Sequence, residues 1–131
     1  MSAFETIRLT DAALEIAPDD SRVRMLARHA DGSMAQFELA PGQISRPVAH
    51  RKVEEIWFVL SGHGKIWRRQ GTREEIVALE PSVSLTIPLG THFQFRANPD
   101  GPLSILCVTT PPWPGNHEAF GVEGPWAPTQ T

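Results

Sequence analysis

The apolar residues of this chain occur in short β-rich runs that recur about every ten residues, with Gly, Pro, Asn or Asp between them. Helical periodicity is nearly absent. Runs of this kind are typical of an all-β protein. The predicted strands cover residues 22–29, 34–39, 53–60, 64–69, 74–79, 83–87, 92–97 and 103–110.

Two of the segments between these runs have the residues of tight hairpin turns, HADGS at 29–33 and SGHG at 61–64. One flat sheet built from all the predicted strands would leave long unpaired edges, which favour aggregation. The spacing therefore predicts that the strands close into a barrel or form a double-sheet jelly roll.

The two ends of the chain differ from this middle part. Residues 1–20 predict a short extended arm, FETIRL, followed by a weakly helical DAALEI. Residues 111–131 are rich in proline and predict an irregular strap, because proline removes a backbone donor and favours extended structure. We expect one domain over residues 1–131, with a barrel core at about 22–110.

Composition and charge narrow the range of partners. The chain has 131 residues and a net charge of −3, and its acidic and basic residues are mixed. Nucleic acid is not an expected partner, because no basic stripe is present for a phosphate backbone. No apolar window approaches the roughly 20 residues of a membrane span, and no basic start precedes an apolar run. We therefore expect a cytoplasmic protein that does not bind membranes, with its lone Cys107 buried in LSILCVTT.

Two spaced motifs lie in the middle of the chain. The first has Gly42, His50, Glu55 and Gly62, and the second has Pro88 and Gly90. Over roughly residues 34–110 this order resembles the cupin family, and in particular its small single-domain bacterial members. The resemblance implies an all-β fold, the cupin double-stranded β-helix or jelly-roll barrel. Two histidine positions of the family pattern differ, because this chain has Val48 and Phe93 there, with His92 one residue early.

Cupins point the matched glutamate into the barrel, so the resemblance implies that Glu55 is interior. Successive side chains of a strand point to opposite faces. The inward set is then Glu55, Trp57, Val59, Phe93 and Phe95, and the outward set is Glu54, Ile56, Phe58, Leu60, His92, Gln94 and Arg96. His50 is expected to enter from the preceding loop. A bulge beside the Gly90 turn would bring His92 inward.

The resemblance also implies a site for a divalent transition metal (Fe, Mn, Ni or Zn), held by histidines and a carboxylate. His50 and Glu55 are the candidate ligands, with His92 as a third. Two ligands alone rarely hold a metal tightly, so the alternative is that no metal is bound. His50 and Glu55 then form either an acid/base pair or a hydrogen-bonded pair at the barrel rim.

Several apolar side chains are candidates for lining a small-molecule pocket in the barrel, with ordinary core packing as the alternative. They are Val48, Trp57, Phe93 and Phe95. We expect a barrel that binds a small molecule and has a degenerate metal site, with no catalytic residue assigned. The alternatives are a metal-dependent enzyme (dioxygenase, isomerase or lyase) that uses His50 and Glu55, and a structural dimerising module. A homodimer is expected, because residues 56–60 are apolar on both faces.

Overall fold

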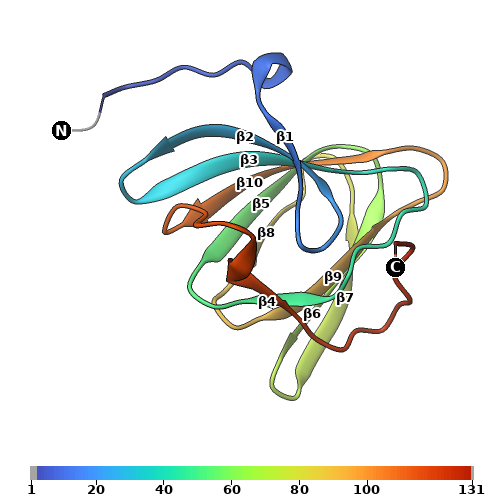
Figure 1. Cartoon of the computed structure of the whole chain (residues 1–131). Coiled ribbons are helices and arrows are strands. Elements are labelled where there is room, and N and C mark those ends of the chain that lie inside the picture. Colours follow the sequence, from blue (N-terminus) through green and yellow to red (C-terminus); the bar gives the residue numbers. More distant parts are fainter. Residues whose placement is uncertain (1–2, 131) are drawn as a thin grey trace.

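Two antiparallel sheets face each other in the computed structural model, which describes residues 3–130 (Figure 1). The first sheet has the order β1-β2-β3-β10-β5-β8 and the second the order β11-β4-β9-β6-β7. The strands are β1 Leu14–Ile16, β2 Arg22–His29, β3 Gly32–Leu39, β4 Val48–His50, β5 Glu54–Ser61, β6 Gly64–Gln70, β7 Arg73–Leu79, β8 Ser84–Ile87, β9 His92–Ala97, β10 Leu103–Thr110 and β11 Ala119–Gly121. Two short 3-10 helices, η1 Leu9–Asp11 and η2 Asn116–Glu118, lie outside the sheets.

The all-β jelly-roll prediction is confirmed, and each of the eight predicted strands is present with ends shifted by at most a few residues. Three further strands, β1, β4 and β11, were not predicted. Each has three residues, which is too short to show a period of two in the sequence. They form because a neighbouring strand supplies their hydrogen bonds, as β4 does for β11. The predictions of a helical DAALEI and of a loop around His50 were therefore wrong.

The core lies between the two sheets and is built by strand alternation. Along β5 the side chains of Glu55, Trp57 and Val59 are buried, while those at the intervening positions are exposed. The predicted facing of β5 is confirmed. Other fully buried apolar residues come from both sheets, including Leu39, Ile66, Leu79, Ile87, Phe95, Leu103 and Ile105. Cys107 is also buried, as predicted.

The SGHG turn between β5 and β6 requires glycine for steric reasons. Gly62 has φ +85°, a conformation that side chains with a Cβ rarely adopt. A Cβ atom added there would lie 2.1 Å from the Pro102 carbonyl oxygen. The glycine therefore allows the chain to turn tightly against Pro102 and the start of β10.

The outward side of the second sheet is covered by the C-terminal segment. Gln94 points outward on β9, as predicted, yet its side chain is fully buried. Its amide donates to the carbonyl oxygens of Ser45 and Trp126 at 2.8 Å and accepts from the Trp126 backbone N–H. The Pro-rich strap is thus fixed to the barrel by paired hydrogen bonds, although most of it has no regular structure.

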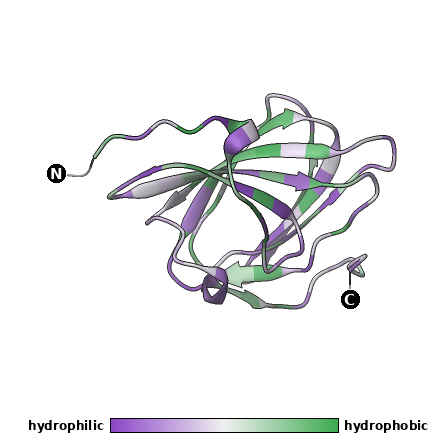
Figure 2. Cartoon of the chain, turned by 45° about the horizontal axis from the view of Figure 1, so that its top comes forward, coloured by the Kyte–Doolittle hydropathy of each residue, from purple (hydrophilic) through white to green (hydrophobic). Residues whose placement is uncertain are grey.

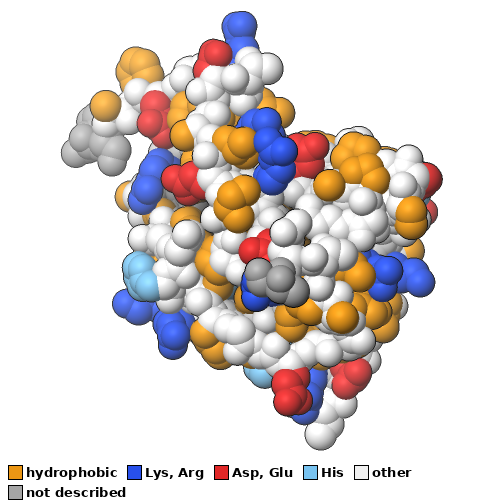
Figure 3. Space-filling model, turned by 45° about the vertical axis from the view of Figure 1, so that its right-hand side comes forward, with side chains coloured by type: hydrophobic (Ala, Val, Ile, Leu, Met, Phe, Trp, Pro, Cys, Tyr) orange, Lys and Arg blue, Asp and Glu red, His pale blue; other side chains and the backbone are white. Residues whose placement is uncertain are grey.

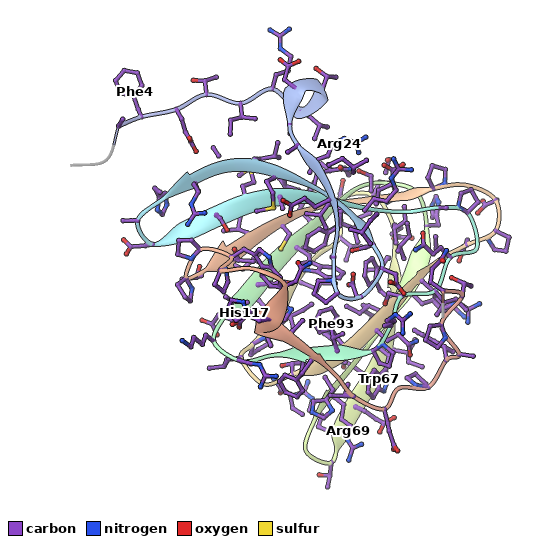
Figure 4. All side chains as sticks on the ribbon, viewed as in Figure 1. Phe4, Arg24, Trp67, Arg69, Phe93 and His117 are labelled. Atoms are coloured by element: carbon purple, nitrogen blue, oxygen red, sulfur yellow. The ribbon has the colours of Figure 1, made fainter. Side chains whose placement is uncertain are left out.

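The outward side of β5 has no such cover within residues 3–130. Ile56, Phe58 and Leu60 are 58%, 42% and 43% exposed. The N-terminal arm lies outside the two sheets (Figures 1 and 2) and is tied to β2, because the Glu5 carboxylate accepts a hydrogen bond of 2.9 Å from the Arg28 backbone N–H. It carries Phe4 near its tip (Figure 4). Phe4 is fully exposed, so the arm makes no apolar contact with its own barrel there.

Charged side chains of both signs are interspersed on the face drawn in Figure 3. Three ion pairs join strands or turns: Arg24 with Glu38, Arg46 with Asp20, and Arg68 with Glu75. Within residues 3–130, none of the helices is long and apolar enough to cross a membrane.

Candidate functional site

A small cavity opens between the two sheets, on the side where the turn before β2 and the segment after β10 come together. The space open to the centres of water-sized molecules is about 40 Å³, which is room for a few waters or one compact group. Apolar side chains make up most of its wall. The polar and titratable side chains of its lining are Glu15, Asp19, Ser21, Ser33, His50, Glu55, Thr109 and Asn116.

Glu55 reaches this cavity from the middle of the first sheet, where β5 pairs with β10 and β8. Its side chain is buried, and its Oε1 accepts a hydrogen bond of 2.9 Å from Trp57 Nε1. Burial raises the pKa of Glu55 to about 7, because desolvation disfavours the charged form. The Trp57 hydrogen bond lowers this pKa, and the charge of Asp19 raises it further. Glu55 therefore exchanges its proton near neutral pH.

Asp19 is a second buried carboxyl group of the same cavity, and the sequence analysis missed it. It lies in the turn between β1 and β2, where its Oδ1 accepts hydrogen bonds from the Ser21 backbone N–H and hydroxyl group at 3.0 and 2.6 Å. Burial raises its pKa despite these bonds. The adjacent Asp20 points elsewhere and pairs with Arg46. The Asp-Asp-Ser sequence indicated a turn, but it could not tell which aspartate faces inward.

His50 ends β4 on the opposite side of the cavity and packs between two aromatic rings. The centroid of its imidazole lies 5.3 Å from that of Phe93 and 5.4 Å from that of Trp113, in edge-to-face geometry. Burial lowers the pKa of His50 to about 4, and the nearby Glu118 carboxylate opposes this shift. The imidazole is therefore neutral at neutral pH. Its Nδ1 is buried and has no hydrogen-bond partner within residues 3–130, and leaving a buried polar atom unpaired costs free energy.

Glu118 fixes the chain segment that follows His50. Its buried carboxylate accepts hydrogen bonds from the backbone N–H groups of Lys52 and Val53, the second at 2.7 Å. Burial by itself would raise the pKa of Glu118, but these two hydrogen bonds together with the nearby His50 and Arg51 backbone lower it overall, so the side chain is a carboxylate. The backbone of Arg51 also donates to the Glu118 carbonyl oxygen at 3.0 Å. The C-terminal segment thereby positions His50 through the backbone of the residues that follow it. No motif in the sequence indicated this role.

Two hydroxyl groups complete the polar part of the wall. Ser33, Thr109 and Glu55 lie side by side across β3, β10 and β5. The hydroxyl groups of Ser33 and Thr109 bond each other, and Ser33 Oγ accepts from the Trp113 backbone N–H at 2.9 Å. Both hydroxyls are thus already engaged, and they tie the strap residue Trp113 to the cavity.

The structure brings together some of the predicted site residues and separates others. His50, Glu55, Val48 and Phe93 all line the cavity, and Figure 4 shows Phe93 between the two sheets. Trp57 and Phe95 are fully buried behind this lining, with ring centroids 4.8 Å apart. His92 pairs with Arg69 across β9 and β6 and is not part of the lining.

These residues do not fit a transition-metal site. In the part of the chain that the structure describes, no group of three or more His, Cys, Asp or Glu side chains could hold a metal ion. The two positions at which cupins place further histidines are Val48 and Phe93, which pair with each other across β4 and β9. An apolar pair therefore stands where metal ligands would be needed.

The fold is a jelly-roll barrel with a cavity between its two sheets. A sequence model of the cupin domain matches residues 35–109, more than half of the chain. The protein therefore belongs to the cupin family. No curated protein matches it in sequence.

Solved structures with the same fold differ widely from this chain in sequence. Oxalate decarboxylase from Bacillus subtilis superposes with a TM-score of 0.77 at 15% identity, covering 93% of this chain and 33% of that one. This chain thus spans about a third of the length of that enzyme, which has Mn(II) centers. A variant of Streptomyces Pac13 with uridine has a TM-score of 0.71 at 9% identity, covering 93% and 92% of the two chains. Pac13 is described as a nucleoside dehydratase. At these identities the likeness is one of fold.

Replacing Glu118 by alanine tests its positioning role. The Glu118→Ala protein leaves two backbone N–H groups without their acceptor, and we expect it to lose about 2–4 kcal/mol of unfolding free energy in urea. Glu118→Gln retains an acceptor oxygen and should lose less. Glu123→Ala, which alters an exposed glutamate of the same segment, is the control and should change little. Equal losses for Glu118→Ala and Glu123→Ala would contradict the role assigned to the Glu118 carboxylate.

The pKa of Glu55 predicts a pH dependence of stability. Its folded-state pKa of about 7 lies above the ordinary value of 4.5, so the folded protein binds this proton more tightly than the unfolded chain. The resulting stabilisation is complete below pH 4.5 and is lost as the pH rises through 7. Between pH 5 and pH 8 the unfolding free energy of the parent protein, measured in urea, should fall by roughly 3 kcal/mol through this effect. The Glu55→Gln protein should not show this decrease.

The matched control for this comparison is Glu54→Gln, since Glu54 is exposed on the other face of the same strand. His50 acts in the opposite sense, because its lowered pKa removes stability as the pH falls from 6.5 toward 4. Asp19 acts in the same sense as Glu55. The parent and both variants contain His50 and Asp19. Their contributions to the pH dependence therefore largely cancel when the unfolding free energies of parent and variant are compared. The same pH slope in all three proteins would exclude the proposed protonation of Glu55.

Proposed function

We propose that this cupin binds a small molecule in the cavity between its sheets, with Glu55 and His50 as the polar groups that contact the ligand and without a bound metal. The proposal rests on one observation. Glu55 and His50 come from different sheets and line the same mostly apolar cavity. Ligand pockets typically combine apolar walls with a few polar groups that orient the ligand.

The polar groups of the cavity also support this proposal. Buried polar atoms are nearly always hydrogen-bonded in native proteins. His50 Nδ1 has no partner among the described residues, so a polar group of a ligand that approaches the imidazole would offset a cost that the free protein carries. The apolar Val48 and Phe93 at the ligand positions of the family pattern support binding without a metal.

A second candidate function is acid/base catalysis on the bound molecule. It is favoured by the pKa of Glu55 near 7, since a group that titrates near the working pH can both give and take a proton. Neutral His50 would hydrogen-bond the ligand on the other side. Pac13, whose chain is matched over 92% of its length, is a nucleoside dehydratase, which supports proton-transfer chemistry in a barrel of this size. Glu55 is the residue that we would expect to be essential.

Ligand binding can be tested with a library of small neutral and charged fragments, screened by ligand-observed NMR on protein treated with a chelator. We expect fragment binding to survive chelation. Phe93→Ala should change the affinity of bound fragments about tenfold or more, because Phe93 is a wall of the cavity. Phe95→Ala, the same substitution two residues along the strand, should cost about 3–5 kcal/mol of stability and leave the affinities unchanged.

A library without binders would contradict the proposed function, and so would equal effects of Phe93→Ala and Phe95→Ala on affinity. Elemental analysis of tag-free protein supplies the metal test. We expect far less than one transition-metal ion per chain. A stoichiometric metal would instead support the metal-dependent enzyme, a dioxygenase, isomerase or lyase that uses His50 and Glu55.

We also propose that two copies of this chain form a homodimer through the outward side of β5. The support comes from Ile56, Phe58 and Leu60, which leave one strand face apolar and exposed. Exposed apolar patches of this kind mark interaction surfaces. A second copy is the favoured occupant because the N-terminal arm carries the exposed apolar side chains of Phe4, Ile7 and Leu9, which are 101%, 38% and 41% exposed. The arm of one copy would cover the apolar face of the other.

Light scattering coupled to size exclusion tests the homodimer. At micromolar concentration the parent protein should have about twice the 14.5 kDa mass of one chain. Phe58→Glu should return a single-chain mass, because it places a charge in the contact. Ile76→Glu is the control, since Ile76 is also an exposed apolar residue, at 53% against 42% for Phe58, but lies on the other sheet. A single-chain mass for the parent protein would exclude the dimer.

A further inference from the structure

Two buried carboxyl groups share the cavity without a basic partner. Asp19 is 7% exposed and Glu55 is 4% exposed, and they come from the turn before β2 and from β5. The ion pairs of residues 3–130 use other carboxylates, namely Glu38, Asp20 and Glu75. The residues that line the cavity include no lysine and no arginine. A buried carboxylate normally pairs with a cation, because its desolvation is otherwise uncompensated.

The hydrogen-bonding groups of the cavity are mostly acceptors. The hydroxyl group of Ser21 already donates to Asp19, and Trp57 Nε1 already donates to Glu55. The hydroxyls of Ser33 and Thr109 bond each other. Asn116 is exposed, and the donors that remain among the lining side chains are one ring N–H of neutral His50 and the indole N–H of Trp113. A carboxylate or phosphate would therefore find few free donors, whereas a donor-rich group would find several oxygen acceptors.

Aromatic rings make up much of the remaining wall. Phe37, Phe93 and Trp113 line the cavity together with the carboxyl groups. The faces of such rings attract cations, and the attraction is strongest where water is excluded. A site made of carboxylates and aromatic rings, with little room, is suited to a compact organic cation. An ammonium group has three donors and no acceptor, which complements this lining.

His50 is a second, independent indication of a ligand here. The residue is 8% exposed and lines the cavity, and its buried Nδ1 has no partner. A ligand beside the ring would supply the missing contact. The unpartnered nitrogen and the two carboxyl groups, which have hydrogen bonds but no cationic partner, thus line the same cavity.

We propose that the barrel cavity binds the protonated amino group of a small amine, held between Asp19 and Glu55 and enclosed by Phe37, Phe93 and Trp113. This inference rests on the proposed small-molecule function and specifies its ligand class. The cavity size limits the part of the ligand that is enclosed to a compact head group.

Three probes of equal chain length test the ligand class on the intact protein, by isothermal titration at neutral pH. They are propylamine, which is protonated at that pH, 1-propanol and propionate. We expect propylamine to bind at least tenfold more tightly than 1-propanol, and propionate to bind more weakly than either. Because the parent protein alone decides this comparison, it does not depend on the folding of any variant.

Substitutions that keep size but remove charge locate the bound amine. Asp19→Asn and Glu55→Gln should each weaken propylamine binding about tenfold or more while leaving 1-propanol binding nearly unchanged. Glu54→Gln, on the outer face of β5, should affect neither probe. A propylamine affinity that is insensitive to both Asp19→Asn and Glu55→Gln would overturn the proposal.

Failure of this inference can be told apart from failure of the proposed function. If 1-propanol or propionate binds as tightly as propylamine and Phe93→Ala weakens that binding, the cavity is a ligand site and the amine proposal is wrong. If propylamine does not bind but fragments from the library do, the amine proposal is again wrong while the proposed function stands. If neither propylamine nor any fragment binds, both are wrong.

Discussion

The interior position of the Glu55 carboxyl group constrains the whole cavity. A carboxylate in a dry interior must be protonated or hydrogen-bonded or have a cation nearby. Here Trp57 supplies one hydrogen bond, and no cationic side chain lines the cavity. The raised pKa of Glu55 and the lowered pKa of His50 have the same cause, since burial disfavours the charged form of each. The site therefore holds a neutral histidine opposite an acid that titrates near neutral pH.

The C-terminal segment is an integral part of this site. Glu118 binds the backbone after His50, Trp113 packs on the imidazole ring, and Gln94 anchors the last residues to the second sheet. These contacts hold a segment with few regular hydrogen bonds of its own against the barrel. They also close one side of the cavity, so that the barrel sheets alone would leave His50 and Ser33 more open to water.

Within the cupin fold, this cavity differs from a metal centre in its charge. In a metal-binding cupin the cation that compensates an interior carboxylate is the metal itself. In this chain Val48 and Phe93 occupy histidine positions of the family pattern, and Asp19 adds a second carboxyl group from outside that pattern. The proposed amine would restore the missing positive charge from the ligand. Under this proposal the family motif keeps its acidic and imidazole groups, and the ligand supplies the compensating cation.

The sequence by itself determined the fold class, most of the strands and the facing of β5. Alternation along IWFVL fixes which side chains share a face, and glycine-containing turns fix where strands end. Because IWFVL is apolar on both faces, the choice of the inward face came from the resemblance to the cupin motif. It also identified Glu55 and His50 as interior polar residues, with the help of the family motif. It did not give β1, β4 or β11, because strands of three residues form only when a partner supplies their hydrogen bonds. It also could not place Asp19 or Glu118 at the cavity, since each belongs to a segment whose position depends on contacts far along the chain. Whether an acidic residue in such a turn or strap faces water or the barrel is decided by tertiary packing, because neighbouring aspartates or glutamates in a loop have no alternation to distinguish them.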